Sequence, residues 1–294
     1  MNAAIKQLAR NISLVENDVP GYENLLQNIA QFKGKLIGIT GAPGAGKSTL
    51  TDALITQMVA NNCTVGVLCV DPSSPFNFGA LLGDRIRMNQ WYAHPSVYIR
   101  SLASRGSLGG LHPKIVEITD VMKGFGFDYI IVETVGVGQS EVEIAGLADI
   151  TVVVTVPEGG DDVQAMKSGL MEIADIFVVN KADRPDADIF VRNLQLMLHN
   201  ANPGSRQQNT PVIKTVASEQ KGIDALFEAI VTANNSLQNE QRKLSLLTDK
   251  ALRLIVQQHL KSINISALKQ QLAQLMVNDN FNLYQFLQEK YFNN

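Results

Sequence analysis

The sequence is poor in the residues that build metal centres and disulfide frameworks, and it contains no long apolar run. Its 294 residues include two cysteines, Cys63 and Cys69, and four histidines. Because the cysteines form no Cys-x-x-Cys pair, we expect them to be small core residues rather than metal ligands or a disulfide. No stretch reaches the roughly 18 consecutive apolar residues that a membrane-spanning helix needs. We therefore expect neither a disulfide-stapled domain nor a membrane protein, and a reducing, cytoplasmic setting.

An excess of either charge is also missing. The chain has 25 Lys and Arg against 28 Asp and Glu, a formal net charge of −3. This balance provides no general field that attracts nucleic acid or an acidic membrane, so we expect neither as a partner. Residues 1–10 are basic and amphipathic, but Glu16 and Asp18 follow soon after. That composition favours a helix of the mature protein over a targeting presequence.

Between residues 31 and 233, short β-branched runs alternate with helical stretches. This alternation is typical of an α/β fold with a mostly parallel sheet covered by helices on both faces. Functional loops of such sheets lie at the carboxyl ends of the strands. The predicted strands are Lys35–Thr40, Thr64–Asp71, Val97–Arg100, Asp128–Glu133, Ile150–Val156, Ile176–Asn180 and Val212–Val216.

Both ends of the chain show helical periodicity without strands. Residues 1–30 are predicted to form a helical extension that is broken at Pro20-Gly21. Residues 234–294 follow an apparent hinge at Asn234-Asn235-Ser236 and carry two amphipathic stripes. We expect this carboxyl-terminal arm to pack on the central domain or on a second copy of the chain. The first stripe consists of Leu244, Leu247, Ala251, Leu254, Ile255, Gln258 and Leu260.

The most specific local motif is the glycine-rich segment 41–49, GAPGAGKST, which follows a predicted strand and precedes the helical stretch 50–60. It matches the phosphate-binding loop of a P-loop NTPase. Backbone N–H groups at Gly44, Ala45 and Gly46 would cradle the phosphates. Lys47 would reach the β- and γ-phosphate oxygens and Ser48 would ligate Mg²⁺.

A second motif, Asn180-Lys181-Ala182-Asp183, ends a predicted strand about 130 residues after the phosphate loop and indicates guanine recognition. The Asp183 carboxylate can accept hydrogen bonds from guanine N1–H and its exocyclic amine, whereas adenine lacks this donor pair. GTP is therefore favoured over ATP, with GDP as the product. The segment after the next strand would contact the guanine O6 and comprises Val216, Ala217 and Ser218.

Acidic residues at neighbouring strand ends are the candidates for holding Mg²⁺. Glu133 ends one strand and is followed by Gly136, whose N–H would meet the γ-phosphate. Asp71 ends another strand and would bind Mg²⁺ or position the attacking water; its alternative role is to cap the Pro72-Ser73 turn. Asp84 is a further candidate metal ligand. With Lys47, we take Asp71, Glu133 and Gly136 as the catalytic candidates.

No glutamine directly follows Gly136, where many GTPases keep a water-orienting side chain; Gln139 lies three residues further on. We therefore predict slow intrinsic hydrolysis. Arg85, Arg87 and Arg105 could each neutralise charge on the γ-phosphate during hydrolysis, but an arginine at such a position more often forms a surface salt bridge or a partner contact. Lys167 is equally compatible with a solvated helix position. The candidate switch or partner-contact residues are Arg85, Arg87, Arg105, Gln139 and Lys167.

Taken together, these segments resemble the MeaB/ArgK/MMAA family of GTPases. The resemblance covers roughly residues 30–235, and segment 132–141 is especially particular to the family. The motifs that carry it are GAPGAGKST, VDPSSP, LGDRIRM, SRGSLGG, VETVGVGQSE, GGDDVQAMK and NKAD.

The resemblance implies a G-protein chaperone of adenosylcobalamin-dependent acyl-CoA mutases, chiefly methylmalonyl-CoA mutase. Such proteins gate cofactor delivery and protect the mutase; an adenosyltransferase is a second candidate partner. The resemblance also implies that Thr49 joins the phosphate and Mg²⁺ residues, and that the arm after residue 233 forms a homodimer. Segments 71–88, 101–110 and 158–167 would be switches that contact the mutase.

Two other readings stay open beside this one. A metallochaperone GTPase for a nickel or zinc enzyme would share the fold, but such proteins usually carry His- or Cys-rich tracts. A protein kinase of an amino-acid transport system is the third reading.

A cobalamin-binding Asp-x-His-x-x-Gly segment is absent from the sequence, since His94 and His112 precede proline and His199 and His259 lack the pattern. We therefore expect that this chain does not hold cobalamin itself.

Overall fold

The structure is a computed structural model of the chain and describes residues 3–29, 34–71, 88–104, 111–136, 140–157, 169–200, 210–233, 237–261, 263–275 and 281–292. The chain divides into two compact units, residues 1–244 and 245–294. The sequence predicts domain boundaries after residues 30 and 233, and these boundaries remain predictions.

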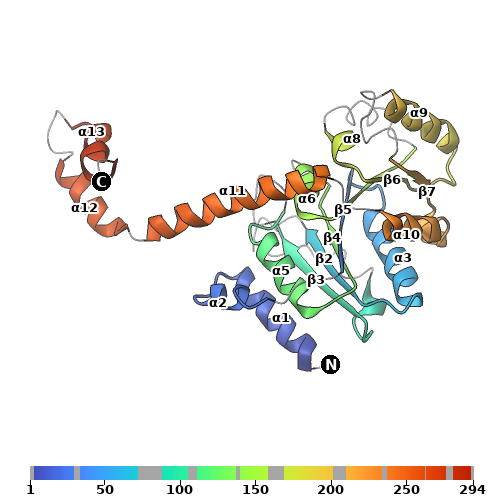
Figure 1. The fold of residues 1–294 in the computed structure, drawn as a ribbon, viewed down its shortest axis with the longest axis horizontal. Coiled ribbons are helices and arrows are strands. Elements are labelled where there is room, and N and C mark those ends of the chain that lie inside the picture. The colour runs from blue at the N-terminus through green and yellow to red at the C-terminus, as the bar shows by residue number, and fades with distance from the viewer. Residues whose placement is uncertain are drawn as a thin grey trace. The chain divides into compact units, whose positions relative to one another are not determined.

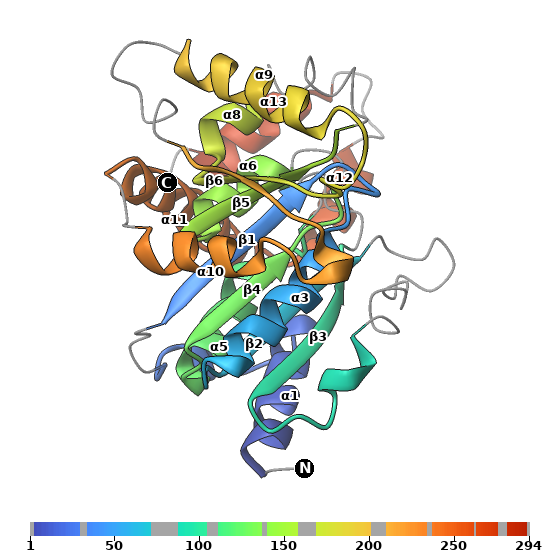
Figure 2. The same ribbon diagram turned by 90° about the vertical axis from the view of Figure 1, so that its right-hand side faces the viewer.

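In the described residues of the first unit, seven strands form one all-parallel sheet (Figures 1 and 2). The strand order is β3-β2-β4-β1-β5-β6-β7, which places β1 between β4 and β5 near the middle of the sheet. An α/β fold with a parallel sheet is thereby confirmed. The strands are β1 Lys35–Gly41, β2 Val65–Asp71, β3 Val97–Ala103, β4 Tyr129–Glu133, β5 Ile150–Thr155, β6 Ile176–Val179 and β7 Val212–Lys214.

Strand ends differ most from the sequence prediction at β3 and β7. β3 continues to Ala103 because its pairing with β2 runs on as far as the pair of Asp71 and Ala103. β7 ends at Lys214 because the chain then turns and Val216 pairs with Lys221 in an antiparallel bridge. Such tertiary pairings are absent from the local pattern on which a sequence prediction depends.

Helices cover both faces of the sheet, as the sequence predicts (Figure 1). One face carries α3 and α10, which pack against each other and on β1 and β6. The other face carries α5, α6, α8 and α9, and α9 packs on Phe177 and Val179 of β6. Among the described residues before 234, the α-helices are α1 Ala3–Glu16, α2 Tyr22–Leu26, α3 Lys47–Ala60, α5 Ile115–Phe125, α6 Ser140–Leu147, α8 Leu170–Ile173, α9 Ala187–His199 and α10 Ile223–Thr232.

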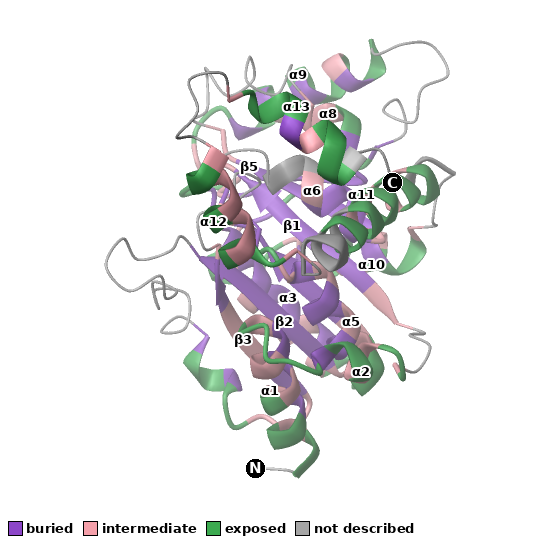
Figure 3. Cartoon of the chain, turned by 90° about the vertical axis from the view of Figure 1, so that its left-hand side faces the viewer, coloured by how far each residue is buried: buried purple, intermediate pink, exposed green. Residues whose placement is uncertain are grey.

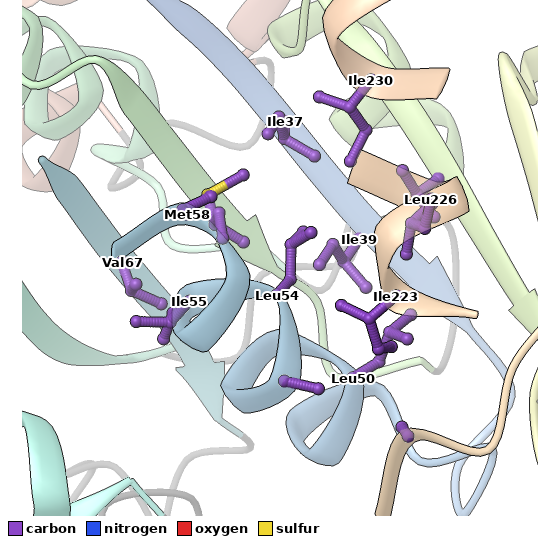
Figure 4. Close-up of a cluster of buried hydrophobic side chains, with 14 of the residues drawn as sticks. Ile37, Ile39, Leu50, Leu54, Ile55, Met58, Val67, Ile223, Leu226 and Ile230 are labelled. Atoms are coloured by element: carbon purple, nitrogen blue, oxygen red, sulfur yellow. The ribbon is translucent and has the colours of Figure 1, made fainter. Parts of the chain in front are cut away.

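A large cluster of buried side chains lies between β1, α3 and α10 (Figure 4). Leu50 and Leu54 of α3 are fully buried between Ile39 of β1 and Ile223 of α10. Each such side chain contributes about 1.5–3 kcal/mol through burial. This packing fixes the start of α3, and with it the loop between β1 and α3. Cys69 belongs to the same cluster, as expected for a core cysteine.

At the amino terminus, the predicted break at Pro20-Gly21 separates α1 from α2. Helix α1 buries Leu8, Ile12 and Val15 and packs on α5. An ion pair between Glu16 and Arg100 joins α1 to β3. The extension therefore belongs to the first unit.

The carboxyl-terminal part of the chain is helical, as the sequence predicts. It contains α11 Leu237–Lys261, α12 Ile265–Leu275, α13 Leu283–Leu287 and a π-helical turn, Gln288–Phe292. The proposed hinge at residues 234–236 lies outside the described residues. Figure 3 contrasts the buried strands with the largely exposed helix α11 and with α12, whose residues are partly exposed and partly intermediate in burial. No helix in the described part of the chain is long and apolar enough to cross a membrane.

Candidate functional site

The loop between β1 and α3 has the backbone of an anion cradle. Gly44 and Gly46 adopt left-handed conformations, with φ of 78° and 88°, which side chains other than glycine adopt at a cost. Gly46 caps α3, and its carbonyl accepts the N–H of Leu50 at 2.9 Å. The helix thus begins at Lys47, three residues earlier than predicted. The partial positive charge of its amino end faces this loop and favours a bound anion.

Lys47 lies folded over the loop. Its side chain is buried, and its Nζ donates to the carbonyl oxygens of Gly41 at 2.9 Å and Ala42 at 3.1 Å. Gly136 closes the same space, because a Cβ there would lie 2.5 Å from Lys47 Nζ and 2.3 Å from Gly41 O. The structure therefore brings Lys47 and Gly136 together, although 89 positions separate them in the sequence.

The Ser48 hydroxyl and the Glu133 carboxylate are in direct contact. Ser48 Oγ donates to Glu133 Oε1 at 2.7 Å, and both side chains are buried. Glu133 Oε2 accepts the hydroxyl of Thr51 at 2.9 Å. Thr51 was not predicted from the motif, yet it follows Ser48 by three positions and so lies on the same side of α3. Thr49, the other predicted loop residue, is half-buried.

Asp71 lies at the end of β2, on the strand next to β4. Cys69 pairs with Glu133 in the register of these strands, so Asp71 stands two residues further toward the carboxyl edge of the sheet. Its side chain is buried and its carbonyl accepts the N–H of Ser104 at 2.9 Å. Six predicted site residues lie outside the described residues, namely Asp84, Arg85, Arg87, Arg105, Gln139 and Lys167.

The Asn180–Asp183 loop is connected to the phosphate loop by hydrogen bonds. Asn180 Nδ2 donates to Ala45 O at 2.9 Å, and Lys181 Nζ donates to Gly44 O at 2.9 Å. A Cβ on Gly46 would lie 2.4 Å from Asn180 Nδ2, so the two loops are in close contact. The two motifs predicted from distant parts of the sequence thus form one site at the carboxyl edge of β1 and β6.

The segment after β7 completes this arrangement. Asn180 Oδ1 accepts the Ala217 N–H and the Thr215 hydroxyl, each at 3.1 Å. Thr215 is fully buried and was not predicted; the signal for it is its place directly before the predicted segment Val216 to Ser218. Ala217 and Ser218 form a 3₁₀ turn, and Ser218 is exposed.

The acid that we expect to read the base, Asp183, is exposed at the end of its loop. Ala182 N–H donates to Thr215 O at 3.0 Å, which holds the loop against the residue that directly follows β7. Nearby, a hydrogen bond to Glu219 raises the pKa of the exposed Lys221 ammonium, and the charge of Asp183 acts in the same direction. Asp183 is therefore held by its backbone while its carboxylate faces solvent.

Chemically, the site combines an amide cradle and a lysine for phosphates with an oxygen pair, Ser48 and Glu133, for a hard divalent cation. The part of the site that contains Asp183 also contains the Asn180 side-chain amide and the backbone around Ala217. This combination suits the phosphates, the accompanying cation and the base of a nucleoside triphosphate.

Known proteins are similar to this chain in sequence and in fold. Residues 8–270 match the family model described as methylmalonyl-CoA mutase-associated GTPase MeaB. A protein named putative GTPase from Pyrococcus abyssi is 49% identical over 238 residues, covering 80% of this chain and 74% of its own. A fused isobutyryl-CoA mutase of Geobacillus kaustophilus is 37% identical over 260 residues, which are 83% of this chain and 24% of that protein.

Among solved structures, one titled as an LAO/AO transport system kinase aligns with a TM-score of 0.67 and 26% identity, covering 98% of this chain and 97% of that one. The family match extends through the phosphate loop, the Ser48–Glu133 pair and the Asn180–Asp183 loop. The chain belongs to the MeaB family of GTPases.

Proposed function

We propose that the chain binds GTP across the two connected loops and hydrolyses it to GDP and phosphate. The observation that carries this proposal is the pair of bonds from Asn180 and Lys181 to the carbonyls of Ala45 and Gly44. They set the base-reading loop at a fixed place beside the phosphate cradle. The exposed Asp183 carboxylate then accepts the two donors of guanine, and adenine would leave it unpaired.

Mg²⁺ is proposed as the accompanying cation. The donor set fits it, because a hydroxyl and a carboxylate supply hard oxygen ligands and nucleotide phosphates supply the others. Ser48 and Glu133 would hold the ion, with Asp71 close to its coordination shell. When bound, Mg²⁺ neutralises charge that develops on the phosphate oxygens.

Hydrolysis is proposed to be slow in the isolated chain. Lys47 binds the β- and γ-phosphate oxygens, and the Gly136 N–H meets the γ-phosphate, which stabilises charge on the transferred group. Residue 137 is valine rather than a water-orienting glutamine. We expect a partner protein to accelerate hydrolysis, either by ordering the attacking water or by supplying a cationic side chain.

The proposed partner is an adenosylcobalamin-dependent acyl-CoA mutase, with methylmalonyl-CoA mutase as the first candidate. Two comparisons support this partner: the family description names such a mutase, and a segment homologous to this chain forms part of a protein named as a fused isobutyryl-CoA mutase. We propose that the γ-phosphate orders segments that contact the mutase and that hydrolysis releases them, which gates cofactor delivery and protects the enzyme. The mutase, rather than this chain, would hold cobalamin, and an adenosyltransferase would be a further partner.

A second copy of the chain is proposed to cover the exposed apolar stripe of α11. Leu247 and Ile255 are 56% and 54% exposed, and Leu254 is 41% exposed. Their spacing places them on one side of the helix, where a partner helix would bury them. A homodimer formed through this arm would bury the apolar face of α11.

A capture experiment tests the partner directly. The chain, loaded with a non-hydrolysable GTP analogue, is used as bait in a native lysate, with GDP-loaded chain and a Lys47→Ala chain as controls. We expect an acyl-CoA mutase to be retained preferentially by the GTP-analogue form. Recovery of hydrogenase or urease components would favour a metallochaperone instead, and transfer of the γ-phosphate to a protein would favour a kinase.

A further inference from the structure

Glu133 is held at both of its carboxylate oxygens by hydroxyls from one helix. Ser48 Oγ donates to Oε1 at 2.7 Å and Thr51 Oγ1 donates to Oε2 at 2.9 Å. The two donors are three positions apart on α3, so they present their hydroxyls on the same side of the helix. The carboxylate at the end of β4 therefore lies between them, and each hydroxyl holds one of its oxygens.

The Thr51 hydroxyl has a choice of acceptor, because its oxygen also lies 3.0 Å from Lys47 O. A hydroxyl has one hydrogen and donates it to one acceptor at a time. The carboxylate is the stronger acceptor because it is charged. In addition, Lys47 O is already in position to accept the Thr51 backbone N–H in the α-helical pattern. We therefore assign the hydrogen bond of the Thr51 hydroxyl to Glu133 Oε2 as acceptor.

Because both side chains are buried, loss of the bond between Thr51 Oγ1 and Glu133 Oε2 would be costly. The Thr51 side chain is fully buried, and Glu133 is 3% exposed. A carboxylate removed from water requires hydrogen bonds to its oxygens, and loss of a donor costs the desolvation of that oxygen. Without the Thr51 hydroxyl, Glu133 would be expected to turn about its side-chain torsions toward other donors, which would take Oε1 away from Ser48.

We propose that Thr51 is a positioning residue for the cation site: it holds Glu133 Oε2 so that Oε1 stays against Ser48, and so it sets the affinity of the nucleotide complex for a divalent cation. This proposal rests on the proposed GTP and Mg²⁺ site and adds a residue to it. Thr51 itself touches neither phosphate nor cation. Its effect is exerted through Glu133, as outer partners of metal ligands act in other metal sites.

The test measures release of a fluorescent GDP analogue as a function of Mg²⁺ concentration, from zero in EDTA to saturation. Thr51→Val removes the hydroxyl at nearly constant volume, and Thr51→Ser retains it. Thr56→Val is the matched control, because Thr56 Oγ1 donates to Asp52 O at 3.0 Å on the same helix and has no bond to Glu133. Thermal unfolding of each variant is recorded in parallel.

We expect Thr51→Val to raise the Mg²⁺ concentration for half-maximal retention about tenfold. The expected half-maximal concentrations of Thr51→Ser and Thr56→Val are within twofold of the wild-type value, and all four proteins should release nucleotide equally fast in EDTA. A Thr51→Val curve that coincides with wild type would overturn the proposal. So would an equal shift in Thr56→Val, because that result would indicate a general weakening of α3.

A double-mutant cycle with Glu133→Gln provides a second measurement. If Thr51 acts through the carboxylate, Thr51→Val should add no further shift in the Glu133→Gln background. Additive shifts would contradict the inference. The proposed function fails separately, when the wild-type chain retains nucleotide equally well with and without Mg²⁺.

Discussion

At the residue scale, the site depends on side chains and glycines that approach one another to within van der Waals limits. A Cβ on Gly136 would meet the ammonium of Lys47, and a Cβ on Gly46 would meet the amide of Asn180. Both glycines also have positive φ, of 83° and 88°. These positions tolerate no larger residue without displacement of a group that contacts the proposed nucleotide.

Lys47→Ala should weaken GTP binding about 100-fold or more, because a charged donor to two phosphate oxygens is lost. The fold should persist, since the Lys47 ammonium donates to loop carbonyls and not to the core cluster. Isothermal calorimetry gives the affinity and circular dichroism the fold. Lys6→Ala, at an exposed position of α1, is the control. Unchanged affinity in Lys47→Ala would refute the assignment of the phosphate loop.

The sequence predicted the residues that motifs define and missed those that only the fold brings near. Lys47, Ser48 and Asn180 belong to patterns with fixed spacing, and the structure places them in one site. Thr51 and Thr215 belong to no such pattern, because a buried hydroxyl becomes functional only when a strand end supplies its acceptor. Helical spacing relates Thr51 to Ser48, but the identity of the acceptor, Glu133, depends on how β4 lies beside α3.

At the element scale, the positions of β1, β4 and α3 decide the geometry of the site. The strands were predictable because buried parallel strands are nearly continuous apolar runs, whereas the strand order was not, because it depends on which edges pair. Asp128 helps to fix β4 beside β2: the N–H and hydroxyl of Thr64 donate to its Oδ2, both at 2.7 Å. These bonds hold the pKa of Asp128 below its usual value.

Asp128→Ala should lower the free energy of unfolding at pH 7 by about 1 kcal/mol, a modest amount because solvent screens the exposed carboxylate. A carboxyl whose pKa is lower in the folded state stabilises the protein above its unfolded-state pKa of about 3.9. That contribution disappears as the pH falls through the folded-state pKa. The difference between variant and wild type should therefore shrink from pH 7 to pH 3.

Denaturant unfolding at both pH values measures this difference. Asp249→Ala, an exposed position on α11, serves as the control and should have no effect. An equal loss of stability at pH 7 and pH 3 would show that the charge of Asp128 is not responsible.

At the scale of the whole molecule, the first unit contains the proposed nucleotide site and the second unit carries apolar helix surface. The base of α11 is anchored within the first unit, where Arg242 donates to the carbonyls of Glu172 and Ile173, and Lys243 pairs with Asp149. Beyond residue 244 the apolar stripe continues with Leu247 and Leu254. The sequence indicated the stripe through its helical spacing.

Leu247→Glu combined with Leu254→Glu should convert the proposed homodimer to a monomer, because two buried charges at a helix interface are costly. Light scattering after size exclusion should change from twice the 32.1 kDa chain mass to the chain mass itself. Val256→Glu, an exposed apolar position on the opposite side of α11, is the matched control and should stay dimeric. A wild-type chain that is monomeric at all concentrations would contradict this proposal.

The central claim is that the connected loops form a GTP site in which Asp183 reads the base. Competition calorimetry in the presence of Mg²⁺, with GTP, ATP and xanthosine triphosphate, tests it most directly. We predict that the wild type binds GTP about 100-fold more tightly than ATP, because ATP leaves Asp183 without its two donors. Asp183→Asn should prefer xanthosine triphosphate, whose carbonyl replaces the guanine amine, while Asp224→Asn retains the preference for GTP. A wild-type chain that binds ATP as tightly as GTP would contradict the account.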